Sequence, residues 1–568
     1  MSSPSFLSFE RVRNAIIGRN FTFRTPYGVR LLTYADYTAS GRSLEFIEQF
    51  LIKVQREYAN THTEDDITGR HMTSLLHHAE ALIKKALNAE DNCSVISVGT
   101  GATGAISKLQ EILGVKIHPA TKKLALTLVP EIDNLITYFN ERKPVVFIGP
   151  YEHHSNDLMW REALVELITI QITPEGYFDL EDLKIKVSNP KFKDRLKIGT
   201  FSAASNVTGI KSPIYEIARI MHEYNGIACF DYAASAPYIK IDMNKDAESY
   251  IDAIYLSPHK FVGGPGSSGI LVFNNSLYDS NIPPTCPSGG TVKFVSPKVM
   301  DFIDDTESRE KAGTPGILQT IKAFLAIDLK DAIGISKIEE KELEYISRAL
   351  KRLQKNKNIE ILGPIDPHKR ISIVSFKIKH DDKYIHPKLT TNLLNDLFGI
   401  QSRAGCMCAG SYGHMLLNIE EEVTIKIRKL ISQNIKGINP GWCRVNFHYL
   451  HSELEFQFIC DAIEFIADHG KIFLSEYRFN YQTGEWNHCK FNNKQEETIP
   501  TIKNIQEMEL RNCFEESLID RELKFASYMK EAKNIISSLE EPSNYGKFKN
   551  PVAEALRWFN FVHIENEI

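Results

Sequence analysis

The chain has 568 residues, of which 43% are hydrophobic and 24% charged, a composition typical of globular proteins and unlike disordered or fibrous chains. Its 67 basic and 72 acidic side chains give a net charge of −5, so no basic excess favours nucleic acid as a partner. This length exceeds one simple core and predicts two to four domains or subdomains.

The cysteine content and the lengths of the apolar runs indicate the cellular compartment. The nine cysteines are odd in number and irregularly spaced, which argues against a disulfide framework and favours a reducing environment. The first residues lack a basic segment followed by an apolar stretch, and no later apolar run is long enough to cross a bilayer. We therefore expect a soluble, cytoplasmic protein without a membrane partner.

The first ninety residues predict an arm followed by helices. Residues 1 to about 33 are expected to form an arm with a short helix, and helical patterns follow over 44–58 and 71–87. The second pattern contains three histidines but no HExxH motif, so these are interpreted as ordinary helix residues and no metal site is predicted.

A glycine-rich turn, Gly99 to Gly104, joins a predicted strand (94–98) to an apolar-periodic helix (105–113). The unpaired N–H groups at the start of such a helix suit a phosphate group. The spacing also fits the dinucleotide-binding pattern GxGxxG. However, the next predicted strand, 123–129, is followed by Pro130-Glu131, which is too late and in an unsuitable turn for the acidic residue of that motif. An NAD-dependent oxidoreductase is thus a remote alternative.

Strand and helix patterns then alternate. Continuous apolar runs predict strands buried on both faces, with amphipathic stretches such as 214–224 between several of them. The predicted strands are 145–149, 167–172, 197–202, 226–230, 252–256 and 269–273. This order predicts an α/β fold with a mainly parallel sheet, in which ligands bind where strand ends meet loops.

Polar side chains follow four of these strands in succession. They are the pair His153 and His154, then Asn206, Asp231 and Lys260. A lysine at a strand end, with a hydroxyl and an imidazole beside it, suits a Schiff base to an aldehyde cofactor. Together with the glycine-rich turn, this combination rarely arises by chance.

In this order the residues resemble the class V aminotransferase family of fold-type I pyridoxal-phosphate (PLP) enzymes, particularly its cysteine desulfurase and selenocysteine lyase branch. The resemblance covers about residues 30–465 and implies PLP as cofactor. It implies the PLP-dependent transferase fold type I, with a large α/β domain and a smaller α+β C-terminal domain. The expected divisions are an N-terminal arm and helix joining the small domain (1–59), the large domain (60–330), the small domain (331–469) and an extension of unknown role (470–568).

The same resemblance implies a role for each cofactor-site residue. Lys260 would form the Schiff base and move the substrate α-proton, Asp231 would pair with the pyridine nitrogen, and His153 would stack on the ring and shuttle protons, with His154 in a structural role. Asn206 would donate to the phenolic oxygen. The phosphate would be held by Gly101, Ala102, Thr103, Ser257 and His259. Thr314, in a loop 311–316, resembles a family threonine that reaches the partner subunit's phosphate, which implies a homodimer with shared active sites.

Two positions depart from the family pattern. Ala234 and Tyr238 stand where the family often has glutamine and histidine. The missing contact leaves the tuning of the Schiff base open, and it is the only support for a noncatalytic PLP-fold protein.

The region after residue 330 predicts helices over 338–353 and 390–397 and a strand over 371–377. By resemblance, Arg444 binds the substrate α-carboxylate through a bidentate pair, with Arg403 as a second candidate. Cys408 stands five residues after Arg403, where the desulfurase branch has its nucleophile, and Cys406 competes for that role. A buried, inert Cys408 is the alternative, and no second cysteine pair supports a Cys-x-Cys metal site.

The resulting hypothesis is a cysteine desulfurase that converts L-cysteine to alanine and leaves a persulfide on Cys408, with a sulfur-acceptor protein as candidate partner. A class V aminotransferase, an epimerase or another lyase without a cysteine nucleophile is the alternative. Beyond the resemblance, residues 477–486 predict a hairpin, 502–539 a polar helical region, and 553–562 an apolar segment that docks on the core or on a partner.

Overall fold

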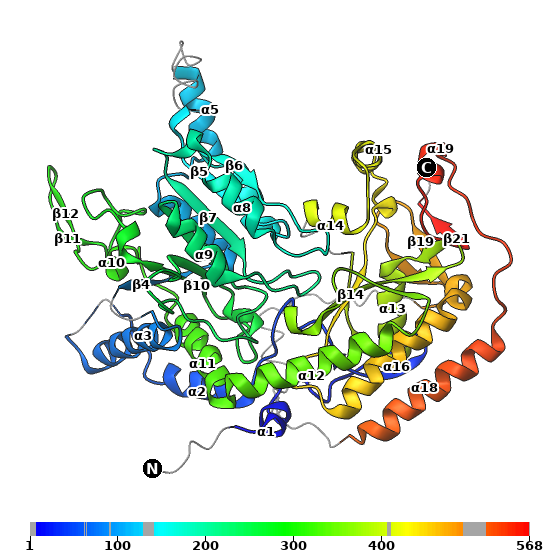
Figure 1. Cartoon of the computed structure of the whole chain (residues 1–568). Helices are drawn as coiled ribbons and strands as arrows, with labels where there is room; N and C mark the ends of the chain where they lie inside the picture. Colours follow the sequence, from blue (N-terminus) through cyan, green and yellow to red (C-terminus); the bar gives the residue numbers. More distant parts are fainter. Residues whose placement is uncertain are drawn as a thin grey trace.

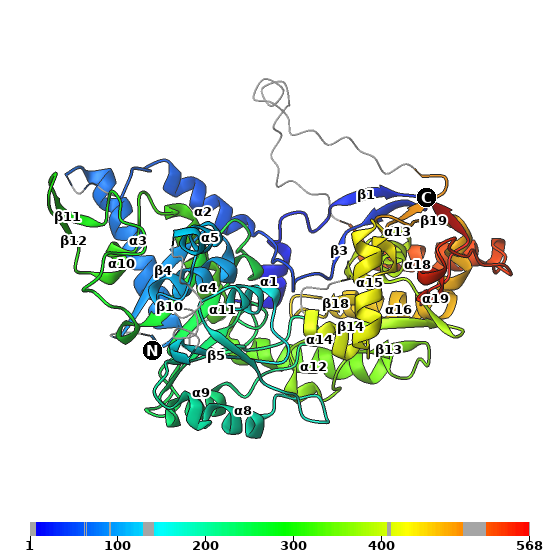
Figure 2. The ribbon, with the colours of Figure 1, turned by 90° about the horizontal axis from the view of Figure 1, so that it is seen from above.

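The structure is a computed structural model that describes residues 7–61, 63, 65–89, 92–128, 141–405, 410–491 and 519–566. Figures 1 and 2 show two lobes, each built around a β-sheet. The N-terminal arm runs from one lobe to the other (Figure 2), and the long helix α12 (Ile335–Leu353) lies along both (Figure 1).

Seven strands form the sheet of the first lobe, in the order β4-β10-β9-β8-β7-β5-β6. The pairings from β9 to β6 are parallel, whereas β10 is antiparallel to both of its neighbours. The strands are β4 (Cys93–Val98), β5 (Val145–Ile148), β6 (Glu166–Thr169), β7 (Lys197–Ser202), β8 (Gly226–Asp231), β9 (Ala253–Leu256) and β10 (Gly269–Asn274). The mainly parallel sheet and its predicted strands are confirmed.

Both faces of this sheet are buried because neighbouring apolar residues point to opposite sides. Along β5, Phe147 belongs to the core beneath α8 (Leu180–Val187) and α9 (Ile214–Glu223), and Val146 belongs to the core beneath α4 (Gly101–Ile112). The helices of this lobe are α3 (Ile67–Ala86), α4 (Gly101–Ile112), α5 (Pro119–Leu128), α7 (Leu158–Arg161), α8 (Leu180–Val187), α9 (Ile214–Glu223), α10 (Thr306–Arg309) and α11 (Ile317–Ile333). A hairpin of β11 (Val292–Val295) and β12 (Met300–Phe302) projects from it (Figure 1).

The strand predicted over 123–129 is wrong. Residues up to Leu128 belong to helix α5, which projects from the first lobe (Figure 1), and Val129 lies outside the described residues. Pro119 at the first helical position has the backbone angle that a helix start requires, and the alanine, lysine and leucine residues after it are strong helix formers. Leu124 and Leu128 are exposed rather than buried in a sheet.

The second lobe contains the smaller sheet β13-β14-β18-β17, with β15 paired to β14. Its strands are β13 (Ile359–Ile361), β14 (Ile373–His380), β15 (Lys383–Ile385), β17 (Arg403–Ala404) and β18 (Cys443–Asn446). Its helices besides α12 are α13 (Pro387–Phe398), α14 (Gly410–Leu416), α15 (Glu421–Ser432) and α16 (Glu453–His469). The strand and two helices predicted for this region are confirmed.

The N-terminal arm contacts both lobes. Its strand β3 (Thr33–Tyr34) pairs in parallel with β16 (Ile400–Gln401) in the second lobe, and its helix α2 (Glu45–Gln55) packs against α11 in the first. The other elements of the arm are α1 (Phe9–Asn14), which is the predicted short helix, and a hairpin of β1 (Thr22–Thr25) and β2 (Gly28–Leu31).

The C-terminal extension packs on the second lobe. The predicted hairpin is confirmed as β19 (Tyr477–Asn480) and β20 (Trp486–His488), and β21 (His563–Glu565) adds a third strand in parallel with β19. Helix α18 (Arg521–Ser538) covers the later part of the predicted helical region; residues 502–518 lie outside the described residues. After α19 (Pro551–Ala555), Phe559 and Phe561 are fully buried in the core, which confirms the predicted docking there.

Within the described residues, no helix combines the length and the apolar character that a bilayer crossing requires. The cysteines of that part of the chain are free thiols: Cys93, Cys229, Cys286, Cys443, Cys460 and Cys489.

Packing of α18 on the second lobe depends on Phe525, whose ring stacks on Phe458 with 3.9 Å between ring centroids. Phe525→Ala is expected to destabilise this packing by about 3–5 kcal/mol, because it removes a buried aromatic ring. Amide hydrogen exchange should accelerate in α18 while the seven-stranded sheet stays protected. Leu523→Ala, on the same helix but 69% exposed, is the control. Equal exchange in both variants would contradict this role of Phe525.

Candidate active site

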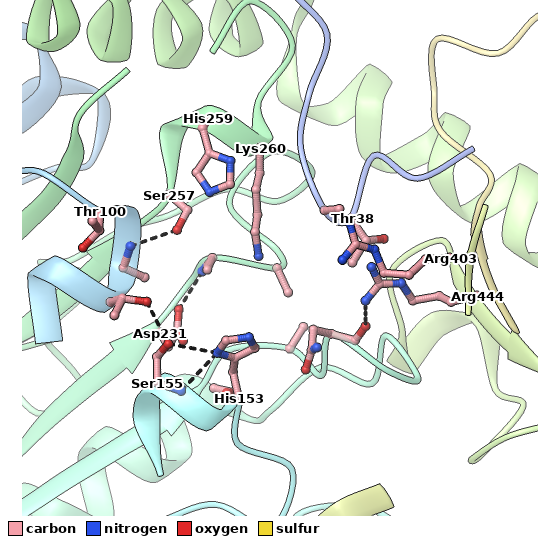
Figure 3. A pocket seen from close by; sticks show the side chains of 18 residues that line it. Thr38, Thr100, His153, Ser155, Asp231, Ser257, His259, Lys260, Arg403 and Arg444 are labelled. Carbon is pink, nitrogen blue, oxygen red and sulfur yellow. Dashed lines mark hydrogen bonds between the residues drawn. The ribbon is translucent and has the colours of Figure 1, made fainter. Parts of the chain in front are cut away.

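A cavity lies where the carboxyl ends of the parallel strands face the second lobe. Ten of the predicted site residues line it: Ala102, Thr103, His153, Asn206, Asp231, Ser257, His259, Lys260, Arg403 and Arg444. Figure 3 shows His153, Asp231, Lys260 and the two arginines directed toward it from different elements. The first eight of the ten lie at or after the carboxyl ends of strands of the large sheet, whereas the two arginines lie on β17 and β18 of the second lobe.

The turn after β4 forms one end of the cavity. Helix α4 begins there at Gly101, and the Ala102 N–H donates to Ser257 Oγ at 2.9 Å. Gly101 has a positive φ of 59°, and a Cβ on Gly269 would lie 2.4 Å from the Gly101 carbonyl oxygen. The turn therefore packs directly on β10, and it presents N–H groups of the first turn of α4 together with the Thr103 hydroxyl.

This topology also excludes the dinucleotide-binding interpretation of the glycine-rich turn. That motif requires a strand with a parallel neighbour in a βαβ unit. Here β4 lies at the edge of the sheet, and its neighbour β10 is antiparallel.

Two neutral histidines lie in the cavity. The Nδ1 atom of His153 accepts the Ser155 N–H at 3.1 Å, so the neutral ring carries its proton on Nε2. Burial lowers the pKa of His153 to about 4, and the charges of Lys260, His154 and Arg444 act in the same direction. Burial and the charge of Lys260 also lower the pKa of His259 to about 4.

Asp231 is the last residue of β8, and its carboxylate is 5% exposed. One oxygen accepts the Ala233 N–H at 2.9 Å. Burial raises the pKa of Asp231, whereas this hydrogen bond and the charge of Lys260 act in the opposite direction. Lys260, in the turn after β9, extends its amine into the cavity (Figure 3). A buried carboxylate in such a setting favours a second cationic partner.

The two arginines lie at the opposite end from α4. Arg444 is 3% exposed, and its guanidinium donates to the Asn206 carbonyl at 2.8 Å and to Asp36 Oδ1 at 3.2 Å. Arg403 donates to Asp36 Oδ2 at 3.0 Å. The side-chain oxygen of Asn206 is buried and has no hydrogen-bond partner among the residues that the structure describes.

Some predicted residues do not line the cavity. Gly101 is buried in the backbone of the turn that begins α4. Thr314 is exposed and accepts a hydrogen bond from the Asn60 side chain at 3.0 Å. Cys406 and Cys408 lie outside the described residues. The chain resumes at Gly410, whose N–H donates to His154 Nε2 at 3.1 Å, so His154 anchors the segment that follows the two cysteines.

Sequence reasoning missed Asp36, Thr38 and Ser155. Thr38 and Ser155 line the cavity, and the Ser155 hydroxyl bonds Thr103 at 2.7 Å. Asp36 and Thr38 belong to an irregular stretch of small and polar residues in the arm, which was the available signal. Of the two atypical family positions, Ala234 lines the cavity, and Tyr238 is buried against His448, with 5.6 Å between ring centroids.

The family model "Aminotransferase class-V" matches residues 117–455. The chain belongs to the class-V aminotransferase family. It is similar to a probable cysteine desulfurase of Halalkalibacterium halodurans, at 31% identity over 273 residues that cover 46% of this chain and 61% of that protein. It is also 24% identical to a probable cysteine desulfurase of Streptomyces coelicolor, over 66% of this chain and 83% of that protein.

Solved structures of family members share the fold. The cysteine desulfurase of Thermococcus onnurineus superposes with a TM-score of 0.62 at 20% identity, over 82% of this chain and all of that one. The cysteine desulfurase CsdA of Escherichia coli superposes with a TM-score of 0.57 at 17% identity, over 76% and 93% of the two chains. The predicted fold type I of PLP-dependent transferases is thereby confirmed.

The buried, neutral His153 makes stability depend on pH. The pKa of His153 is about 4 in the folded chain and about 6.5 when unfolded. As the pH falls below 6.5, the unfolded chain binds a proton that the folded chain does not, so stability decreases toward pH 4. His153→Gln is expected to reduce the loss between pH 7 and pH 5 by roughly 2 kcal/mol. Urea denaturation of the cofactor-free protein measures this, with exposed His118→Gln as control. Identical pH dependence in wild type and His153→Gln would contradict the buried neutral state.

Proposed function

We propose that the protein is a PLP-dependent cysteine desulfurase that converts L-cysteine to L-alanine and receives the sulfur as a persulfide on Cys408. The observation that carries this proposal is the convergence of Lys260, Asp231 and His153 with two arginines on one cavity. The similarity to probable cysteine desulfurases supports the choice of substrate.

The cavity fits each functional group of PLP, the cofactor of this family's enzymes. The N–H groups at the start of α4, with Thr103, Ser257 and His259, suit the phosphate. Asp231 suits the pyridine nitrogen, because a protonated ring would supply the cation that this buried carboxylate favours. Asn206, whose side-chain oxygen has no hydrogen-bond partner among the described residues, suits the phenolic group, and Lys260 suits the aldehyde. When bound, PLP withdraws electrons from the substrate's α-carbon.

The chain's own residues orient the substrate and move its protons. Arg444 and Arg403 bind the α-carboxylate, so the α-carbon is directed toward Lys260, whose amine removes the α-proton. His153 is neutral above about pH 4, so its Nε2–H can donate a hydrogen bond at neutral pH. The second lobe supplies both arginines of this end of the cavity, of which Arg444 is buried.

Cys408 acts on the sulfur. Its thiolate attacks the substrate sulfur, an S–S bond forms, and the Cβ–S bond breaks. The electron pair left on Cβ takes up a proton to give the methyl group of alanine. Overall, L-cysteine and one thiol become L-alanine and one persulfide, so no external oxidant or reductant is needed. The hydrogen bond from the Gly410 N–H to His154, the neighbour of His153 in the sequence, supports this role for the preceding segment.

The proposal includes the oligomeric state, the sulfur acceptor and the cellular compartment. We infer a homodimer in which Thr314 contacts the partner subunit's cofactor phosphate, because Thr314 is exposed and lies outside its own cavity. A sulfur-acceptor protein would receive the persulfide sulfur, and the free cysteines favour the cytoplasm.

Lys260→Ala is expected to remove the absorbance band of lysine-bound PLP and to lower alanine formation from L-cysteine by about 100- to 10,000-fold, because the proton-transfer group is lost. Absorbance spectroscopy and amino-acid analysis measure the two effects. Lys240→Ala, at a side chain that is 69% exposed, is the control. Persistence of the lysine-bound band in Lys260→Ala would place the Schiff base elsewhere.

Cys408→Ser is expected to lower alanine formation by about 100-fold or more, since a hydroxyl is a poor nucleophile toward sulfur. Exchange of the substrate α-proton with deuterated solvent should continue, because Lys260 is intact. Cys406→Ser is the matched control and should keep its activity. Alanine formation at the wild-type rate in Cys408→Ser would exclude this nucleophile. Turnover in a variant that lacks both Cys406 and Cys408 would favour an aminotransferase, epimerase or lyase instead.

A further inference from the structure

Asp36 connects the two arginines of the cavity. It lies in the N-terminal arm, is 4% exposed, and uses its two oxygens for different partners. Oδ2 accepts from Arg403 Nε at 3.0 Å, and Oδ1 accepts from Arg444 Nη2 at 3.2 Å. The two arginines are themselves paired across strands β17 and β18. One carboxylate therefore bridges two neighbouring guanidinium groups.

The backbone fixes Asp36 at this position. The preceding residue, Ala35, donates its N–H to the Gln401 carbonyl at 2.9 Å and accepts the Asn446 N–H at 2.9 Å. Gln401 lies two residues before Arg403, and Asn446 lies two residues after Arg444. The arm is thus inserted between the segments that carry the two arginines, and the backbone next to Asp36 is held to both of them.

This bridge leaves Arg444 with donor capacity for a further anion. Two guanidinium charges and one carboxylate charge sum to +1. Arg444 is held through Nη1 and Nη2, whereas its Nε has no hydrogen-bond partner in the described part of the chain. The Thr38 hydroxyl, from the same stretch of the arm, is buried without a described partner and lines the cavity beside the arginines (Figure 3). One more carboxylate would neutralise this end of the cavity, and a second would be in excess.

We propose that Asp36 is a positioning and specificity residue that orients Arg403 and Arg444 toward one α-carboxylate and selects amino acids with an uncharged side chain over dicarboxylic ones. This inference rests on the proposed role of the two arginines in substrate binding. Without Asp36, two unopposed guanidinium groups would favour a dianionic ligand and would repel each other out of the orientation that a single carboxylate needs.

The test compares binding of two amino acids to the holoenzyme. L-Alanine and L-aspartate are titrated against wild type, Asp36→Asn and Asp36→Glu, and the absorbance of bound PLP is followed. Asp36→Asn should weaken L-alanine binding about 10- to 100-fold, the range of a lost charge-assisted contact, and should shift the aspartate-to-alanine affinity ratio about tenfold or more toward aspartate. Asp36→Glu keeps the charge and should retain the wild-type ratio.

A charge-restoring variant separates selection from mere packing. Asp36→Asn combined with Arg403→Gln returns this end of the cavity to +1 and should restore the preference for L-alanine. Asp461→Asn is the matched control, because it removes a carboxylate from Arg352 in an ion pair between α12 and α16 that does not line the cavity. With L-cysteine as substrate, Asp36→Asn should raise KM more than it lowers kcat.

The outcomes distinguish this inference from the proposed function. An unchanged affinity ratio in Asp36→Asn, with both affinities lowered equally, would reduce Asp36 to a structural residue. Wild-type protein that binds both amino acids but makes no alanine from L-cysteine would overturn the desulfurase proposal and leave the ratio readable. No spectral response of the wild type to either amino acid would overturn both. If Asp36→Asn does not fold, Arg403→Gln alone is titrated instead. This variant must weaken the binding of L-aspartate more than the binding of L-alanine.

Discussion

The parallel direction of the strands in the first lobe determines where chemistry can occur. Because β5, β7, β8 and β9 run the same way, the residues that follow them meet at one edge, although they are spread from His153 to Lys260 along the sequence. The reversed strand β10 completes the arrangement, since Gly269 at its start allows the turn before α4 to approach closely. An anion-binding helix start therefore lies opposite a lysine, a carboxylate and an imidazole.

Burial then decides the charge of each group. Both cavity histidines are neutral at physiological pH because removal from water disfavours their charged forms, and nearby cations add to this effect. The remaining charges are those of Lys260 and Asp231 at the centre and of the arginines with Asp36 at the second lobe. Charges separated in this way orient a zwitterionic ligand, because partial removal from water strengthens their field. The two ends consequently suit different groups of one small molecule.

The sequence was informative wherever a residue's environment is local. Continuous apolar runs, such as the one in β7, predict the strands of the large sheet. The polar residues at the ends of those strands, His153, Asn206, Asp231 and Lys260, predict one wall of the cavity. The segment near Leu124 forms an exposed helix and not the predicted strand, because a short leucine-containing segment has no periodicity that separates an exposed helix from a buried strand.

Asp36 could not be found in the same way. Its partners lie 367 and 408 positions away, and no spacing within the arm indicates them. The pairing of β3 with β16 and the hydrogen bond from Asn446 to Ala35 bring this carboxylate to the arginines. Residues whose partners lie in a distant part of the sequence therefore cannot be identified from local sequence patterns.

The C-terminal extension acts on this same pairing. The Tyr528 hydroxyl of α18 accepts the Leu31 N–H at 3.0 Å, and Glu531 pairs with Arg30 at 3.0 Å. Arg30 also donates to the Leu397 carbonyl at the end of α13, and its guanidinium lies over the Tyr528 ring at 4.6 Å.

These contacts fix the arm immediately before β3, and β3 leads directly to Asp36. The extension therefore holds the arm close to Asp36 and stabilises the arginine end of the cavity from outside it. Its packing on the second lobe is thus part of the structure that sets the arginines, although none of its described residues line the cavity.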